Sequence, residues 1–297
     1  MLLSHYKYIQ EIVQHPYNRS GKARSILRYL SWNVGPRLLN EADYTIELIP
    51  GARVILSNAE NYATLAYTCR LYDFEDMLFV LHFLRAGDCF GDFGANVGVY
   101  SVLAGSRDAT VVAVEPVPQT FQKLCTNFRL NQVKGLPKNC GLSDRRQTLA
   151  FTTDRGGMNK VAKAAGSDTC EVEVVTVDEL IDQAGLSPSL VKIDVEGYEM
   201  PLLTGARTLL ASDLLAVIIE MNDSGREYGF SDSSVHELLR ASGFSPFRYD
   251  PFDRRLTTRD GINRSSFNTL YLKDAALAQV RQRVEEAAPI ALPLGLV

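Results

Sequence analysis

Two acidic residues stand where a short apolar run gives way to a turn. In "GDCFGDFGANVG" the run ends at Asp92, and Gly94, Asn96 and Gly98 follow it; in "VVAVEP" the run ends at Glu115. Glycines allow a backbone to approach a ligand, and the N–H groups that open a following helix bind anionic groups. A carboxylate about 20 residues further on can accept both hydroxyls of a ribose. The spacing predicts a nucleotide at this turn, the alternative being a tight turn without a ligand.

The order of residues in the turn selects among nucleotides. A dinucleotide fingerprint reads G-x-G-x-x-G, whereas this turn reads D-x-G-x-N-x-G, and no G-x-x-x-x-G-K-[ST] occurs anywhere. Asp92 is badly placed beside a pyrophosphate and well placed beside a cationic amino group. S-adenosylmethionine combines ribose, adenine and such an ammonium, so we expect this cofactor. An NAD-dependent dehydrogenase is the least favoured alternative.

A second acidic group follows in "SLVKIDVEGYE" and "VIIEMN". Asp194 ends a strand, Lys192 lies on the same face of it, and Glu196 is expected to start the next helix. Methyl transfer to a hydroxyl requires alignment and removal of a proton. Asp194 or Glu196 can serve as the general base; alternatively, Asp194 and Glu220 hold a magnesium ion that acidifies the hydroxyl. A third alternative is that Glu196 only complements a helix dipole.

The elements that must position these residues follow an α/β pattern. Short apolar runs separated by helical stretches predict parallel strands covered on both faces. The expected strands are 88–93, 110–115, 136–141, 190–194 and 214–220, with two antiparallel strands after Gly243. Helices are expected over most of the first 40 residues, at 74–87 and at 274–287, and a hairpin at 44–57.

Composition excludes several classes of protein. The 297 residues carry a formal net charge of −4 without a block of Lys or Arg, which argues against nucleic acid as a partner. Five scattered cysteines without a C-x-x-C pair fit reduced thiols and a cytoplasmic location. No run approaches the roughly 20 apolar residues of a transmembrane segment, and the N-terminus lacks the layout of a signal peptide.

Five blocks together resemble the FkbM family of S-adenosylmethionine-dependent methyltransferases: "GDCFGDFGANVGVYS", "VVAVEPVPQTFQKLCTNFRLN", "GLSD", "VVTVDEL" and "VKIDVEGYEMPLLTGA". The resemblance implies the class I methyltransferase fold, a Rossmann-like α/β domain with seven strands in the order 3-2-1-4-5-7-6, strand 7 being antiparallel. We assign residues 73–297 to this domain and residues 1–72 to an N-terminal extension. The implied reaction is O-methylation of a hydroxyl, most often on a sugar of a glycan, glycolipid or glycosylated natural product.

The resemblance also implies roles for single residues. It puts Asp92, Gly94, Asn96 and Gly98 on the cofactor turn, Tyr100 near the methionine carboxylate, Glu115 on the ribose, and Leu142 and Ser143 beside the adenine. The acceptor must enter from the same edge of the sheet, where position in the chain suggests Tyr72, Glu75 and Asn159.

The sequence also fits other functions. One alternative is a catalytically silent cofactor-binding partner in a biosynthetic complex, because the extension and the apolar tail "IALPLGLV" suit association, including a homo-oligomer. Another is a methyltransferase that acts on an acceptor other than a sugar.

Overall fold

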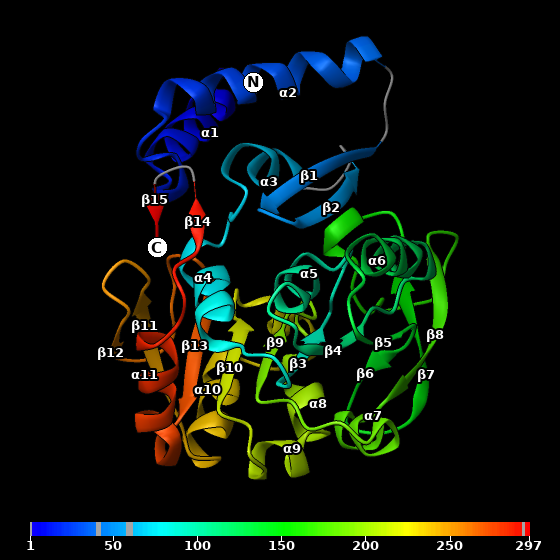
Figure 1. The fold of residues 1–297 in the computed structure, drawn as a ribbon. Coiled ribbons are helices and arrows are strands. Elements are labelled where there is room, and N and C mark those ends of the chain that lie inside the picture. The colour runs from blue at the N-terminus through cyan, green and yellow to red at the C-terminus, as the bar shows by residue number, and fades with distance from the viewer. Residues whose placement is uncertain (1, 40–42, 58–61, 293–294) are drawn as a thin grey trace.

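A computed structural model describes residues 2–39, 43–57, 62–292 and 295–297, and its centre is a mixed sheet of eight strands (Figure 1). β3, β4, β5, β9 and β10 are mutually parallel, and β13 is antiparallel to its neighbours β10 and β11. In spatial order the strands are β12 (Arg255–Thr258), β11 (Phe244–Asp250), β13 (Asn268–Lys273), β10 (Ala216–Glu220), β9 (Leu190–Ile193), β3 (Cys89–Phe93), β4 (Thr110–Val114) and β5 (Gly135–Lys138).

The predicted α/β class with an antiparallel finish is confirmed, but the predicted count of seven strands is wrong. The eighth strand, β12, pairs with β11 through a tight turn after Asp250, whose carboxylate accepts the N–H of Phe252 at 3.0 Å. The sequence predicts no strand here, because three of the four residues of β12 are exposed and give it no apolar signal.

Helices cover both faces of the sheet, as the burial of nearly every residue in β3, β4, β9 and β10 requires. In β4, Val111 and Ala113 join one core cluster, whereas Val112 and Val114 join the other. The first cluster includes α4 (Phe74–Phe83), α5 (Val99–Gly105), α6 (Pro118–Asn131) and α11 (Leu277–Glu285). The second includes α7 (Val177–Ala184), α8 (Glu199–Thr204), α9 (Arg207–Ala211) and α10 (Asp232–Ala241). The helix expected at 74–87 ends earlier, because Leu84 is extended.

A second sheet lies beyond β5, in the order β6 (Gly141–Leu142), β8 (Thr169–Val175), β7 (Gln147–Thr152). The strand expected at 136–141 is therefore two strands, since the chain leaves the central sheet after Lys138 and Gly141 pairs with Val174. The loop between β7 and β8 contains the short 3-10 helix η2 (Gly156–Met158) and carries Asn159 to the edge of the central sheet.

The N-terminal residues form the predicted helices and hairpin. These are α1 (Leu2–Gln14), η1 (Pro16–Asn18), α2 (Lys22–Leu39), β1 (Asp43–Ile49) and β2 (Ala52–Ser57), followed by α3 (Ala63–Cys69). Among the described residues, no helix is long and apolar enough to cross a bilayer.

Two asparagines of α6 attach this hairpin to the main body. The side-chain oxygens of Asn127 and Asn131 each accept a backbone N–H of β2, at 2.8 Å. The amide of Asn127 also donates to the carbonyl oxygens of Ile55 and Val97, at 3.2 and 2.8 Å. These side chains hydrogen-bond the edge of β2 in the way that a neighbouring strand would, and they hold the hairpin against α6.

Candidate active site

Two adjoining recesses open at the carboxyl ends of β3, β4, β9 and β10. Glu115, Leu142, Phe151, Val161 and Tyr198 are among the residues that line the first recess. The second recess is lined by a different set that includes Tyr62, Tyr72, Asp73, Asp92, Tyr100, Lys192, Glu220, Phe267 and Asn268. Both recesses share Gly94, Asn96, Gly157, Asp194 and Glu196, so a ligand that spans them passes these residues.

The glycine turn after β3 packs directly on the turn after β9. Gly94 has a φ of +83°, and a Cβ at this position would overlap the carbonyl oxygen of Asp194. Only glycine combines this conformation with such a close approach. The absence of a side chain therefore brings the predicted cofactor turn against the predicted catalytic residue.

Glu115 is held in a fixed orientation at the end of β4. Its side chain is buried, and its two carboxylate oxygens accept the N–H groups of Asn96 at 3.0 Å and Val117 at 2.9 Å. Each oxygen of a carboxylate can accept more than one hydrogen bond. This arrangement suits a ligand with two adjacent hydroxyls.

Asp92 and Tyr100 form the wall between β3 and α5. Asp92 is 2% exposed and accepts the hydroxyl of Ser101 at 2.6 Å. Burial raises the pKa of Asp92 to about 6, although the Ser101 hydrogen bond opposes this shift. The hydroxyl of Tyr100 donates to Asp73 at 3.0 Å, which places two further polar groups in the second recess.

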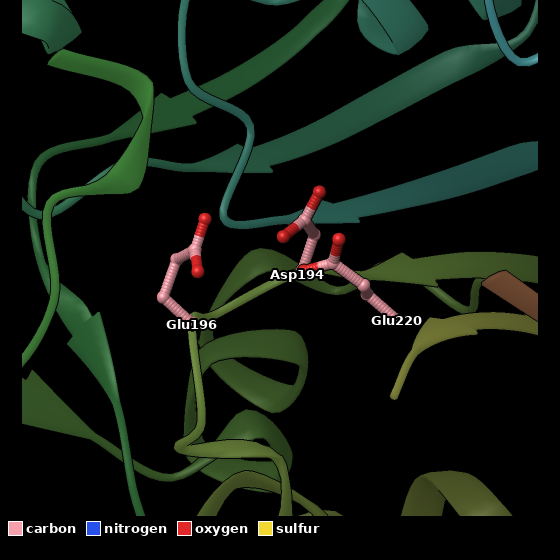
Figure 2. A group of neighbouring side chains, drawn as sticks. All are labelled: Asp194, Glu196 and Glu220. Atoms are coloured by element: carbon pink, nitrogen blue, oxygen red, sulfur yellow. The ribbon is translucent and has the colours of Figure 1, made fainter. Parts of the chain in front are cut away.

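Asp194, Glu196 and Glu220 bring carboxylate oxygens within 4.8 Å of one another. Figure 2 shows the three side chains facing a common space, two from the turn after β9 and one from the end of β10. Lys192 is the buried counter-charge: its Nζ lies 2.6 Å from Oδ2 of Asp194 and 4.9 Å from the centre of the Tyr100 ring.

The three acids differ in protonation because only one of them has the lysine as a close partner. Burial raises the pKa of Asp194, but the charge of the Lys192 ammonium and the hydrogen bonds with Lys192 and Glu220 together lower the pKa overall. Burial and then the Asp194 charge raise the pKa of Glu220 to about 10, so Glu220 carries a proton at neutral pH. Burial alone would lower the pKa of Lys192, yet the carboxylates of Asp194 and Glu220 raise it overall.

Glu196 lies in a strained turn rather than at a helix start. The prediction that it opens the next helix is wrong, since α8 begins at Glu199 and Glu196 has a φ of +52°. Gly197 follows with a φ of +100° and no room for a Cβ beside the Ser224 backbone. Glu199 caps this turn by accepting the N–H of Gly197 at 2.9 Å.

Within the described part of the chain, the Glu196 carboxylate makes no hydrogen bond or ion pair, although it lines both recesses. Burial, followed by the charges of Asp194 and Glu199, raises its pKa to about 7. A carboxylate with these properties is suited to accept a proton from a ligand at neutral pH.

Magnesium was the sequence-based alternative for Asp194 and Glu220. Their oxygens are of the kind that hard cations prefer. However, the ammonium of Lys192 already contacts Asp194, and the proton on Glu220 reduces the negative charge. The magnesium site therefore stays a prediction, and the lysine supplies the positive charge that the structure contains.

The other predicted site residues fall in several places. Leu142 lines the first recess, whereas Ser143 beside it is buried and donates its hydroxyl to Asp144. Asn159, predicted for the acceptor, lines the first recess and not the second. Glu75, also predicted for the acceptor, lines neither recess and pairs instead with Arg248 at 3.3 Å.

Tyr72, also predicted for the acceptor, lines the second recess, and its ring stacks on that of Tyr62 with centroids 5.4 Å apart. Sequence reasoning missed Tyr62, Asp73 and Asn268. One signal for Asn268 was available: a strand antiparallel to β10 must begin where β10 ends, and Asn268 pairs with Glu220.

The model of the methyltransferase FkbM domain matches residues 92–246. The hexuronic acid methyltransferase AglP of Haloferax volcanii is 29% identical over 159 residues, which cover 53% of this chain and 64% of that protein. The 31-O-demethyl-FK506 methyltransferase FkbM of Streptomyces tacrolimicus is 27% identical over 209 residues, covering 58% and 79%. A solved structure, the methyltransferase FkbM from Methylobacillus flagellatus, superposes with a TM-score of 0.43 at 17% identity, over 72% of this chain and 55% of that one.

Proposed function

We propose that this chain, which belongs to the FkbM methyltransferase family, transfers a methyl group from S-adenosylmethionine to a hydroxyl group of a sugar. The observation that carries the proposal is the Glu196 carboxylate. It has a pKa of about 7 and no protein partner among the described residues, and it lies where the two recesses meet. The sugar is part of a glycan, a glycolipid or a glycosylated natural product.

The residues of the first recess fit the nucleoside part of this cofactor. The Glu115 carboxylate is oriented for the two ribose hydroxyls, and Leu142, Phe151 and Val161 offer apolar surface to an adenine ring. When bound, S-adenosylmethionine supplies a methyl group on a positively charged sulfonium. The buried carboxyl group of Asp92 and the half-buried one of Asp73 in the adjoining recess suit the ammonium of the same ligand.

The second recess would hold the acceptor, with its hydroxyl directed at Glu196. Glu196 accepts the proton that this hydroxyl must lose, a role for which a pKa near the working pH is best. Asp194 is the weaker base of the two, because Lys192 lowers its pKa. Asp194 and Lys192 together hold the turn that presents Glu196, and protonated Glu220 donates its hydrogen bond to Asp194.

Two features support a sugar as the acceptor. The stacked rings of Tyr62 and Tyr72 form an aromatic wall, the type of surface that the apolar face of a sugar ring contacts. In addition, the name of the relative AglP specifies a hexuronic acid, which is a sugar, as the molecule that is methylated.

The test is a pair of measurements on the wild type and Glu196→Gln. Calorimetric titration should give the same affinity for S-adenosylmethionine within about threefold, because Glu196 is assigned to the acceptor. Methylation of a panel of glycosides should fall by about 100-fold or more in the variant, the size of a general-base contribution. Glu171→Gln, an exposed residue of β8, is the matched control and should change neither quantity.

Two outcomes would contradict the proposal. Near-normal turnover of Glu196→Gln would remove Glu196 from the reaction. Cofactor binding by the wild type without turnover on any hydroxylated acceptor would instead favour a catalytically silent cofactor-binding partner.

A further inference from the structure

The second recess contains far more acidic than basic groups. Asp73, Asp92, Asp194, Glu196 and Glu220 line it, and Lys192 is the one basic residue among its described lining residues. A ligand that enters this recess therefore meets carboxyl groups on several sides.

The single lysine is not free to bind a substrate. Lys192 is 4% exposed, its Nζ contacts Oδ2 of Asp194 at 2.6 Å, and the Tyr100 ring covers it at 4.9 Å. Recruiting it for a second carboxylate would leave Asp194 without its partner in a buried position, which is unfavourable. A site built for an anionic sugar would instead present an arginine fork or a free ammonium.

The remaining lining is aromatic or polar without charge. Tyr62 and Tyr72 form the stacked pair, Phe267 exposes 47% of its surface, and Ser266 and Asn268 flank it. Phe267 has a φ of +64°, a conformation that costs energy for an aromatic residue and that fixes its position beside the recess. Rings with hydroxyl and amide groups contact an uncharged sugar through CH–π and hydrogen bonds.

These residues lie outside the segment that matches the family. The match covers 92–246, whereas Tyr62, Tyr72, Asp73, Phe267 and Asn268 precede or follow it. Apart from Asp73, the charged residues of the recess lie inside the match, so these aromatic and amide residues belong to the part of the lining that the family model does not describe.

From this lining we infer that the acceptor is a sugar without a negative charge near the methylated hydroxyl, and that uronic acids are rejected. The inference deepens the proposed function and rests on it. Its physical basis is that the recess offers a substrate carboxylate no free cation, whereas Glu196, which must be ionised to accept the proton, repels it in a partly desolvated site. For two unit charges about 8 Å apart at an effective dielectric constant of about 20, the repulsion would lower kcat/KM for the uronide by about 30-fold relative to the neutral sugar.

The experiment compares pairs of methyl hexopyranosides and methyl hexuronides with the same ring configuration. One readout is kcat/KM with labelled S-adenosylmethionine. The other is binding of each sugar to the protein saturated with S-adenosylhomocysteine, measured by saturation-transfer NMR. We expect the neutral member of every reactive pair to be preferred by about 30-fold or more.

A variant tests the cause of the preference. Ser266→Arg places a guanidinium on the rim of the recess. It should raise the ratio of kcat/KM for the uronide to kcat/KM for the neutral sugar by about tenfold. Ser167→Arg adds the same charge in the exposed loop before β8 and should leave the ratio unchanged.

The outcomes separate this inference from the proposed function. Equal use of both members by the wild type overturns the inference and leaves the proposed function intact. If neither member binds or is methylated although S-adenosylmethionine binds, the proposed sugar acceptor fails and the inference with it. A neutral preference that Ser266→Arg does not shift overturns electrostatic repulsion as its cause.

Discussion

Replacing Lys192 by methionine tests the electrostatics of the site most directly. The side chain is 4% exposed and its ammonium is 2.6 Å from Asp194. Methionine has similar length and no charge, so the substitution mainly removes the ion pair. The Asp194 carboxylate then lies beside Glu220 without a cation.

The expected cost is about 3 kcal/mol in the free energy of unfolding at pH 7. Removing one partner of a buried ion pair destabilises a protein by about 3–5 kcal/mol. The lower end applies to this pair, because a third of the Asp194 side chain is exposed and solvent screens its charge.

The destabilisation caused by Lys192→Met should also depend on pH, and the pKa of Asp194 determines in which direction. In the wild type the pKa of Asp194 is lowered, so the pair stabilises the fold above the unfolded pKa of about 3.9, and this contribution disappears as the pH falls through the folded pKa. In the variant the ammonium is gone, so burial raises that pKa and penalises the ionised form, opposed only by the hydrogen bond with Glu220. The difference between the two proteins is therefore largest near neutral pH and decreases towards pH 4.

Urea unfolding between pH 4 and pH 8 measures both effects. A cycle with Asp194→Asn and the double variant isolates the pair, for which we expect a coupling energy of about 2 kcal/mol. Lys138→Met, an exposed residue of β5, is the control and should stay within about 0.5 kcal/mol of the wild type. A coupling energy near zero, or a difference that does not vary with pH, would refute the assignment of Asp194 as an ionised partner of Lys192.

Three further predictions address other parts of the site. In the wild type the methylation rate should rise with pH through about 7 as Glu196 loses its proton, whereas any residual rate of Glu196→Gln should lack this step. Glu115→Gln should weaken S-adenosylmethionine binding by about tenfold or more in calorimetry, and unchanged affinity would contradict the ribose assignment. Dialysis against EDTA should leave the rate unchanged because Lys192 supplies the positive charge near Asp194; a loss that magnesium restores would establish a metal at the acidic cluster.

The cofactor side of the site was predictable because it depends on local patterns. An apolar run that ends in an acidic residue predicts a buried strand and the position of its carboxyl end. Asp92, Glu115 and Asp194 could therefore be placed at the edge of the sheet from the sequence. A glycine near these acidic residues indicates that two turns approach each other closely, as the turn at Gly94 approaches the backbone of Asp194. The pairing of Lys192 with Asp194 follows from their spacing on one strand.

The conformation of Glu196 was not predictable from the same information. An acid shortly after a strand is equally typical of a helix N-terminus, and in this chain Glu199, not Glu196, has that position. What separates the two is the left-handed backbone at Glu196, stabilised by the packing of Gly197 on the Ser224 backbone. That contact joins segments of the chain that sequence spacing does not relate.

The acceptor side was hardest to predict because long-range contacts assemble it. Tyr62 and Tyr72 reach the recess since the preceding hairpin is attached to α6 by Asn127 and Asn131, a connection across more than 70 residues. Asn268 reaches it because β13 inserts antiparallel beside β10.

Asn127 links the acceptor side of the site to the cofactor side. Its amide group forms hydrogen bonds with β2, which precedes the aromatic wall of Tyr62 and Tyr72. It also donates a hydrogen bond to the carbonyl of Val97, inside the predicted cofactor turn. This buried side chain therefore connects the N-terminal segment, which lies outside the family match, to the turn within it. Because this attachment does not involve the residues that line the second recess, those residues can differ between relatives while the cofactor turn and the Lys192–Asp194 pair are kept in place. Such a division allows one methyl-transfer centre to serve chemically different acceptors.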